Sequence, residues 1–149
     1  MKLEDEIKQS KFANEFQKLA INLIFTGNWL NAKSSEYLKQ FGITIQQYNV
    51  LRILRGRYPE PATVNLIIER MLDKMPNASR IVDKLLLKKF VERKTCTEDR
   101  RCVDVMITEK GLKLLSEIEK KESILNKKFT SISIKEAKEI NRYLDKLRD

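Results

Sequence analysis

Hydrophobic residues recur every three to five positions along most of this chain, and over 103–107 the β-branched residues Val103, Val105 and Ile107 alternate with Asp104 and Met106. The first pattern predicts amphipathic helices, and the second predicts a strand buried on one side. Helical spacing runs from Leu3 to about Tyr37, which predicts a long first helix that is kinked or ends near Gly27. This helix has more apolar surface than one small neighbouring element would cover. Its apolar positions are Leu3, Ile7, Phe12, Phe16, Leu19, Leu23, Ile24 and Leu30.

Local signals mark the next two helices. Thr44 and Gln47 form a capping box, in which the threonine oxygen accepts from a free amide and the glutamine reaches back. A helix is therefore predicted from there to about Arg55, and the prolines at 59 and 61 cannot continue it. A short helix then begins at Thr63 or Val64 and ends near Asp73.

Two further helices are predicted after residue 108. Thr108 can cap a helix from Glu109 to about Phe129, and the capping box from Ser133 to Glu136 opens a terminal helix. The terminal helix is expected to bury its apolar edge, which consists of Ala137, Ile140, Leu144 and Leu147.

The centre of the chain combines a short helix after Pro76 with two strands. Four apolar residues at 81, 82, 85 and 86 give the helix one buried side, and its other side is polar. The strands lie around Val91 and at 102–107, and their connecting loop, 97–101, carries two acids and two arginines. This order is that of a winged helix. Asn, Ser and Arg near a helix N-terminus are side chains that reach base edges and phosphates. The alternative is a solvated surface helix with a polar face of Asn77, Ser79, Arg80, Asp83, Lys84 and Lys88.

This central stretch resembles the MarR-type winged-helix transcriptional regulators. The resemblance lies in residues 79–85, in Val91-Glu92-Arg93, and in residues 98–108 together with Gly111. The last block has the family's wing signature, which is an Asp-x-Arg, alternating apolar residues, a threonine and a downstream glycine. The similarity extends loosely over nearly the whole chain.

The resemblance implies a mainly α fold with a small β-hairpin wing, in which a winged helix-turn-helix lies between N- and C-terminal dimerisation helices. Residues 1–149 would form one domain, with the winged helix at about 44–108 and the dimerisation helices at about 1–37 and 109–149. The implied function is regulation of transcription by a homodimer on a pseudo-palindromic duplex site. Two-fold symmetry would place the recognition helices roughly 34 Å apart.

Specific residues follow from this resemblance and from the wing's composition. Arg101 is expected at the wing tip and in a narrow minor groove, where negative potential is focused. Asp99 would orient the wing by holding Arg101 or by bonding nearby backbone, although a plain surface ion pair is the alternative. The predicted DNA-binding residues are Asn77, Ser79, Arg80, Lys84, Arg100 and Arg101.

The family also implies a pocket for a small, often anionic aromatic effector between the dimer helices and the winged helix. Trp29, Phe41 and Tyr48 are expected near such a pocket, and each has an alternative role as an ordinary core residue.

The net charge of the chain favours a polyanionic partner. The chain carries +9, and residues 52–101 hold thirteen lysines and arginines against seven acids, a local charge of +6. The excess therefore coincides with the predicted DNA-binding surface. A basic chain also fits a winged helix that binds protein or RNA, which is the rival hypothesis.

Catalysis, metal binding and export have little support. The chain has no histidine, no glycine-rich phosphate loop and no glycine-flanked serine, so no enzyme activity, cofactor or metal site is expected. Cys96 and Cys102 flank the wing loop and are expected to be structural, with a redox switch as the alternative. The charged N-terminus and the absence of a long apolar run predict a cytoplasmic protein without membrane contact.

Overall fold

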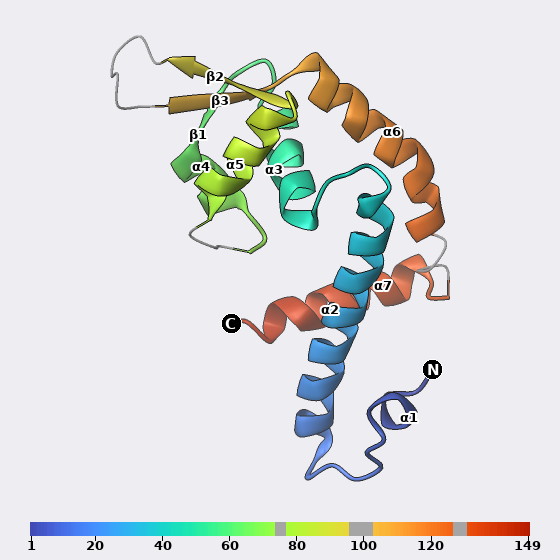
Figure 1. The fold of residues 1–149 in the computed structure, drawn as a ribbon. Helices are drawn as coiled ribbons and strands as arrows, with labels where there is room; N and C mark the ends of the chain where they lie inside the picture. The colour runs from blue at the N-terminus through green and yellow to red at the C-terminus, as the bar shows by residue number, and fades with distance from the viewer. Residues whose placement is uncertain (74–76, 96–102, 127–130) are drawn as a thin grey trace.

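The computed structural model describes residues 1–73, 77–95, 103–126 and 131–149, and these form a mainly helical fold with one small antiparallel sheet (Figure 1). The predicted fold class is confirmed. In chain order the elements are α1 (Leu3–Ile7), α2 (Glu15–Lys39), α3 (Ile45–Arg55), β1 (Ala62–Thr63), α4 (Val64–Arg70), α5 (Ala78–Leu87), β2 (Val91–Thr95), β3 (Val103–Ile107), α6 (Glu109–Asn126) and α7 (Ile134–Lys146).

The long N-terminal helix is interrupted, but not where the sequence predicted. Gly27 lies inside α2, whereas the break falls between Lys8, which adopts a left-handed conformation with φ of 52°, and Asn14. Asn14 caps α2 by accepting from the backbone N–H of Gln17 at 2.9 Å. A mid-helix glycine costs only about 1 kcal/mol relative to alanine, which is too little to stop a helix that continues on both sides.

The predicted capping signals are confirmed. Thr44 with Gln47 and Ser133 with Glu136 form reciprocal capping boxes, and the Thr108 hydroxyl accepts from the Gly111 N–H at 3.2 Å. The helix predicted to end near Asp73 instead ends at Arg70. Its next residue, Met71, turns to an extended conformation and is buried.

The sheet contains a strand that the sequence did not predict. The strand order is β1-β3-β2, with Ala62 opposite Val105 and Val91 opposite Ile107. β1 is only two residues long, so it has no alternating pattern to detect. β1 pairs with the edge of β3 opposite β2, and this pairing joins the segment before α4 to the strands of the wing.

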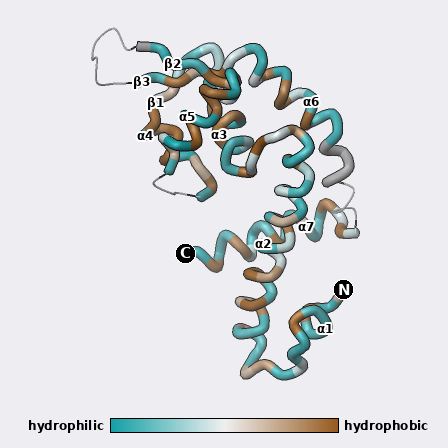
Figure 2. The backbone as a smooth tube through the Cα atoms, viewed as in Figure 1, coloured by the Kyte–Doolittle hydropathy of each residue, from teal (hydrophilic) through white to brown (hydrophobic). Residues whose placement is uncertain are grey.

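The hydrophobic core lies where α3, α4 and α5 meet the sheet and the first half of α6 (Figure 2). α2 contributes one buried residue to it, Leu38, from its last turn. The fully buried large side chains are Leu51, Leu54, Ile67, Leu85, Ile107, Leu115, Ile118, Val50, Val82 and Val105.

Two polar contacts link this core to the surrounding helices. The Tyr37 hydroxyl at the end of α2 donates to the Ile118 carbonyl of α6 at 2.7 Å. The Arg55 guanidinium of α3 lies 2.6 Å from the Glu119 carboxylate, and this hydrogen bond lowers the pKa of Glu119 below its ordinary value. The last turn of α2 and the middle of α6 are therefore joined to the winged helix.

The lower half of α2, together with α1 and α7, lies away from the core (Figure 1). The expectation that α7 buries its apolar edge is met only in part within one chain. Ala137 and Leu144 are half-buried, but Ile140 is 45% and Leu147 57% exposed. The same holds on α2, where Phe16 is 82% and Ile24 66% exposed. Neither helix has enough of its own chain beside it to cover its apolar stripe.

Candidate nucleic-acid interface

α5 presents two chemically different faces. Ala78, Val82 and Leu85 are buried against the core, because their spacing places them on one side of the helix. The opposite side is exposed and carries the predicted contact residues. Asn77, Ser79, Arg80 and Lys84 all lie on it, at or just before the first two turns.

Three of these predicted residues surround a single hollow. Asn77, Arg80 and Lys84 line it from α5, and the first turn of α3 lines its other side. The hollow has a volume of about 320 Å³. The sequence did not predict Thr44, the N-cap of α3, or Gln46 in its first turn at this site. The capping box was visible in the sequence, but nothing in a single sequence places the start of α3 beside α5.

The C-terminal end of α5 is held by a lysine. The Lys88 ammonium donates to the Gly42 carbonyl and to the Gln47 side-chain oxygen, the latter at 3.3 Å. Gln47 is only 3% exposed, and it also accepts from the Thr44 N–H in the capping box. From the other side, the Lys110 ammonium of α6 donates to the Lys88 carbonyl at 3.0 Å. α5 is thereby fixed to the starts of both α3 and α6.

The exposed face of α5 also contacts β2. The Arg93 guanidinium lies 2.6 Å from the Asp83 carboxylate, and the two side chains are 55% and 54% exposed. This pair was not predicted, although both residues lie within the stretches that carry the family resemblance. The predicted wing residues Asp99, Arg100 and Arg101, and Cys96 and Cys102, lie outside the described residues.

The three aromatic residues predicted near an effector lie in three different places. Trp29 borders a hollow beside α1, and Tyr48 lines a cavity of about 220 Å³ together with Tyr37 and Arg52. Phe41 makes an edge-to-face contact with Tyr37, and the Lys121 ammonium lies 5.4 Å from the centre of its ring. The structure does not bring the three together.

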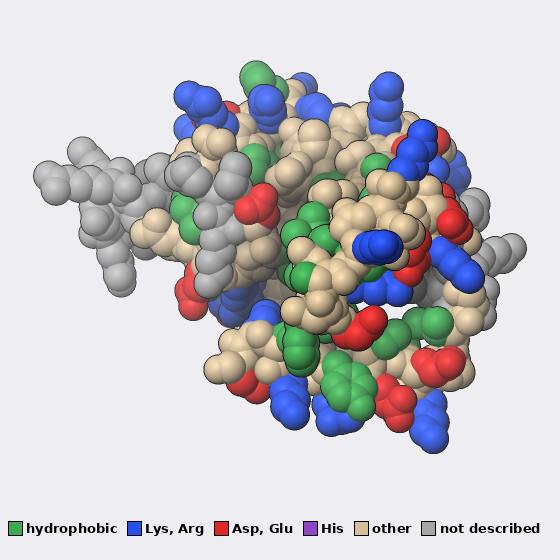
Figure 3. Space-filling model, turned by 90° about the horizontal axis from the view of Figure 1, so that it is seen from below, with side chains coloured by type: hydrophobic (Ala, Val, Ile, Leu, Met, Phe, Trp, Pro, Cys, Tyr) green, Lys and Arg blue, Asp and Glu red, His purple; other side chains and the backbone are tan. Residues whose placement is uncertain are grey.

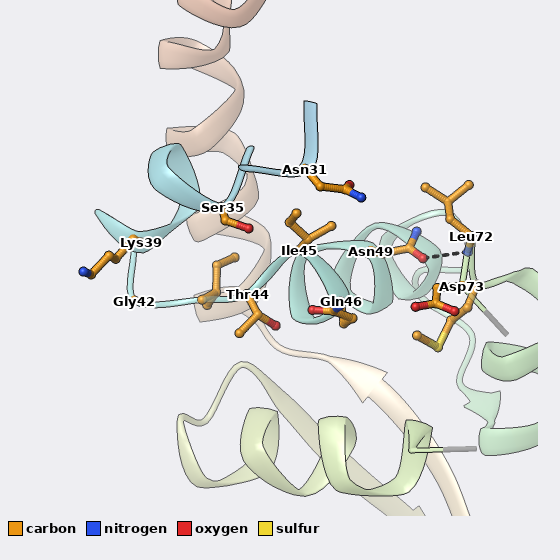
Figure 4. Close-up of a pocket in the computed structure, with 12 residues that line it drawn as sticks. Asn31, Ser35, Lys39, Gly42, Thr44, Ile45, Gln46, Asn49, Leu72 and Asp73 are labelled. Atoms are coloured by element: carbon orange, nitrogen blue, oxygen red, sulfur yellow. Dashed lines mark hydrogen bonds between the residues drawn. The ribbon is translucent and has the colours of Figure 1, made fainter. Parts of the chain in front are cut away.

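A larger cavity, of about 830 Å³, lies between the end of α2, the start of α3 and the segment after α4 (Figure 4). Asn49 lines this cavity and the Tyr48 cavity, and its side-chain oxygen accepts from the Leu72 N–H at 3.0 Å. This bond holds the segment that leads towards α5. The other lining residues are Asn31, Ser35, Lys39, Gly42, Ile43, Thr44, Ile45, Gln46, Met71 and Asp73.

An apolar groove of about 790 Å³ separates α2 from α7. Viewed from below, hydrophobic side chains reach the surface in the middle of the molecule, with charged side chains around them (Figure 3). The groove is lined mainly by aliphatic residues, with Leu19, Leu23 and Leu30 from α2 and Ala137, Ile140 and Leu144 from α7.

Among the described residues, no three His, Cys, Asp or Glu side chains are grouped so that they could hold a metal ion. None of the described helices is long and apolar enough to cross a membrane.

A helix pair of α4 and α5, followed by an antiparallel β2–β3 hairpin and backed by α3, defines a winged helix-turn-helix protein. Comparison with known proteins assigns the family. Residues 43–103 match the model of the MarR family. The chain is 30% identical over 101 residues to the HTH-type transcriptional regulator MhqR of Bacillus subtilis, a match that covers 68% of each chain. The chain belongs to the MarR family of transcriptional regulators.

Solved structures agree over most of the chain. A MarR transcription factor from Planctomyces limnophilus is 30% identical, with a TM-score of 0.70 over 91% of this chain and 98% of its own. The MepR–DNA complex of S. aureus has a TM-score of 0.77 at 22% identity, over 87% of this chain and 94% of its own. A MarR-like regulator of Bacillus cereus reaches 0.79 at 18% identity, over 90% and 96%. The two less identical structures support the fold alone.

Proposed function

We propose that this chain regulates transcription as a homodimer, binding a pseudo-palindromic duplex DNA site through α5 and the wing and leaving it when a small ligand binds. The observation that carries the proposal is the exposed face of α5, where Arg80 near its start and Lys84 in its last turn border a hollow shared with α3. Two basic side chains with Asn77 and Ser79 beside them provide both phosphate neutralisation and hydrogen bonds to base edges.

The homodimer is supported by the uncovered apolar stripes of α2 and α7. Burying apolar surface contributes about 25 cal/mol per Å², so large exposed aliphatic side chains on two neighbouring helices favour association. Residues of α2 and α7 line the groove between these helices. The exposed apolar residues of α2 and α7 in a second copy could fill it. Two copies related by a two-fold axis would present two α5 helices to successive major-groove segments.

Release by a small ligand is supported by the cavity around Asn49. A ligand there would compete for the Asn49 side chain, which holds the Leu72 N–H and hence the segment leading towards α5. Arg52 borders the smaller cavity, whose lining, as far as the structure describes it, contains no acidic residue, which favours an anionic ligand there, and Tyr37 and Tyr48 offer contact to an aromatic ring. A small aromatic acid is the ligand class that this lining fits best.

The proposal is tested by selecting fragments that the protein binds from genomic DNA and by measuring affinity for a selected duplex and for an unrelated one. Arg80→Ala should lose roughly 1–3 kcal/mol on the selected duplex and narrow the gap between the two duplexes, because a base contact is lost. Arg101→Ala should weaken both and make the salt slope shallower by about one unit, because a phosphate contact is lost. Arg148→Ala, at the exposed C-terminus, is the control.

All variants must keep the melting temperature of the unsubstituted protein, so that a loss of affinity reports on recognition. If the selected duplex binds Arg80→Ala and Arg101→Ala within a factor of two of the original affinity, the proposed DNA contacts are wrong. If the protein enriches no duplex and instead retains RNA or a protein, the winged helix is an interaction module of another kind.

A further inference from the structure

The exposed face of α5 contains one carboxylate, Asp83, beside the basic residues that are proposed to meet DNA. It follows Arg80 by three positions and precedes Lys84 directly, so it shares their solvent-facing side. A carboxylate on a surface that approaches phosphates repels them and lowers affinity. A DNA-binding helix tolerates such a residue when something cancels its charge or when the residue has a separate task.

Arg93 supplies the opposite charge, and the sheet places it where it reaches the helix. In β2, Arg93 is two residues from Val91, so the two side chains share one face of the sheet. Val91 is buried on that face, and the partners of Val91 and Arg93 in β3, Ile107 and Val105, are buried too. This buried face of the sheet packs in the same core as α5. The Arg93 guanidinium extends from it to within 2.6 Å of the Asp83 carboxylate.

The pair has little to offer the stability of the fold. Both side chains are more than half exposed, and ion pairs of this kind contribute little because water screens them. Its position is more informative than its strength. It joins α5, the helix proposed to enter the major groove, to β2, the strand that leads into the wing.

We infer that Asp83 and Arg93 are positioning residues for DNA binding: their ion pair sets the recognition helix relative to the wing and keeps the Asp83 charge away from phosphate. The inference rests on the proposed function. It also says that Arg93 acts through Asp83 and not by its own contact with DNA, so the two residues must be coupled in affinity.

A double-mutant cycle tests this coupling with the full chain. The four proteins are the original, Asp83→Asn, Arg93→Gln and the double variant, and the probes are a duplex selected by the original protein and an unrelated duplex of equal length. Arg93→Gln should lower the affinity of the original protein for the selected duplex about tenfold. In the Asp83→Asn background, the same substitution should lower the affinity by less than about twofold relative to Asp83→Asn alone. Arg93→Lys, which keeps the charge, should retain most of the affinity.

The alternatives give different results. A direct phosphate contact by Arg93 predicts the same loss with and without Asp83→Asn, together with a salt slope reduced by about one unit, and would overturn the inference. If the Asp83 and Arg93 substitutions are coupled in their effect on the melting temperature but not in their effect on DNA affinity, the ion pair is a structural contact only. That result would also overturn the inference. An original protein that does not prefer the selected duplex overturns the proposed function itself.

Discussion

Gly111 in the first turn of α6 faces the carbonyl oxygen of Phe90 so closely that a Cβ atom at position 111 would lie 2.4 Å from that oxygen. The same Cβ would lie 2.7 Å from the Cγ1 atom of Ile107. The Phe90 carbonyl accepts from the Thr108 N–H at 3.0 Å, so it cannot move without loss of that bond. Gly111, the glycine of the family's wing signature, therefore allows α6 to start directly against the end of the sheet because it has no Cβ atom.

Gly111→Ala should accordingly destabilise the protein by about 1–3 kcal/mol, because backbone must shift to admit the methyl group. Chemical denaturation monitored by circular dichroism measures this change. Gly27→Ala is the matched control, since a Cβ at Gly27 meets no atom within 4 Å, and there the expected change is a gain of up to about 1 kcal/mol. Equal stabilities for the two variants would contradict the close approach.

Ile140→Asp should dissociate the proposed homodimer. Ile140 lines the apolar groove between α2 and α7 and is 45% exposed in one chain, so a charge there would be buried without a partner when a second copy docks. Light scattering at micromolar concentration should give the dimer mass for the original protein and half that mass for the variant. Leu72→Asp, on a residue that is 90% exposed outside this groove, should remain dimeric. A monomeric original protein would refute the dimer.

Asn49→Ala should weaken binding to the selected duplex several-fold while leaving the unrelated duplex nearly unaffected. The substitution removes the acceptor of the Leu72 N–H and so loosens the segment that leads towards α5. Fluorescence anisotropy measures both affinities. Ser35→Ala, on the wall of the same cavity, is the control and should behave as the original protein. Identical behaviour of Asn49→Ala and Ser35→Ala would exclude a role for this bond in recognition.

Acid should remove the stabilisation that Glu119 provides through Arg55. The folded state holds the pKa of Glu119 below its ordinary value of 4.5, so the ionised carboxylate stabilises the fold above that value. The contribution is lost as the pH falls through the lowered folded-state pKa. Both side chains are at least a third exposed, so the effect should be at most about 1 kcal/mol.

Thermal melts between pH 7 and pH 3 should therefore show a smaller drop for Glu119→Gln than for the original protein. Glu117→Gln, an exposed carboxyl on the same helix, provides the comparison, and its melting curve should follow that of the original protein. The same pH dependence in all three proteins would mean that the Arg55 contact has no energetic consequence.

Much of the architecture could be read from short-range patterns. The capping boxes at Thr44 and Ser133 and the cap at Thr108 are interactions within one helical turn, so the sequence specifies them directly. The buried and exposed faces of α5 follow from helical periodicity in the same way. Gly27 was misjudged because a single glycine is a weak signal in a helix that continues on both sides, and α4 ends three residues before Asp73, where Met71 turns to an extended conformation and is buried in the core.

Most of the helices, the wing hairpin, the family resemblance and the exposed side chains at the start of α5 could be predicted from the sequence, because they depend on residues close together in the chain. Which distant residues meet is fixed by the packing of the folded chain. It placed the start of α3 beside Arg80 and Lys84, Arg93 against Asp83, and Asn49 against Leu72. It also left the apolar edges of α2 and α7 uncovered. Such contacts depend on how elements pack across the core, and periodicity along the chain carries no information about that packing.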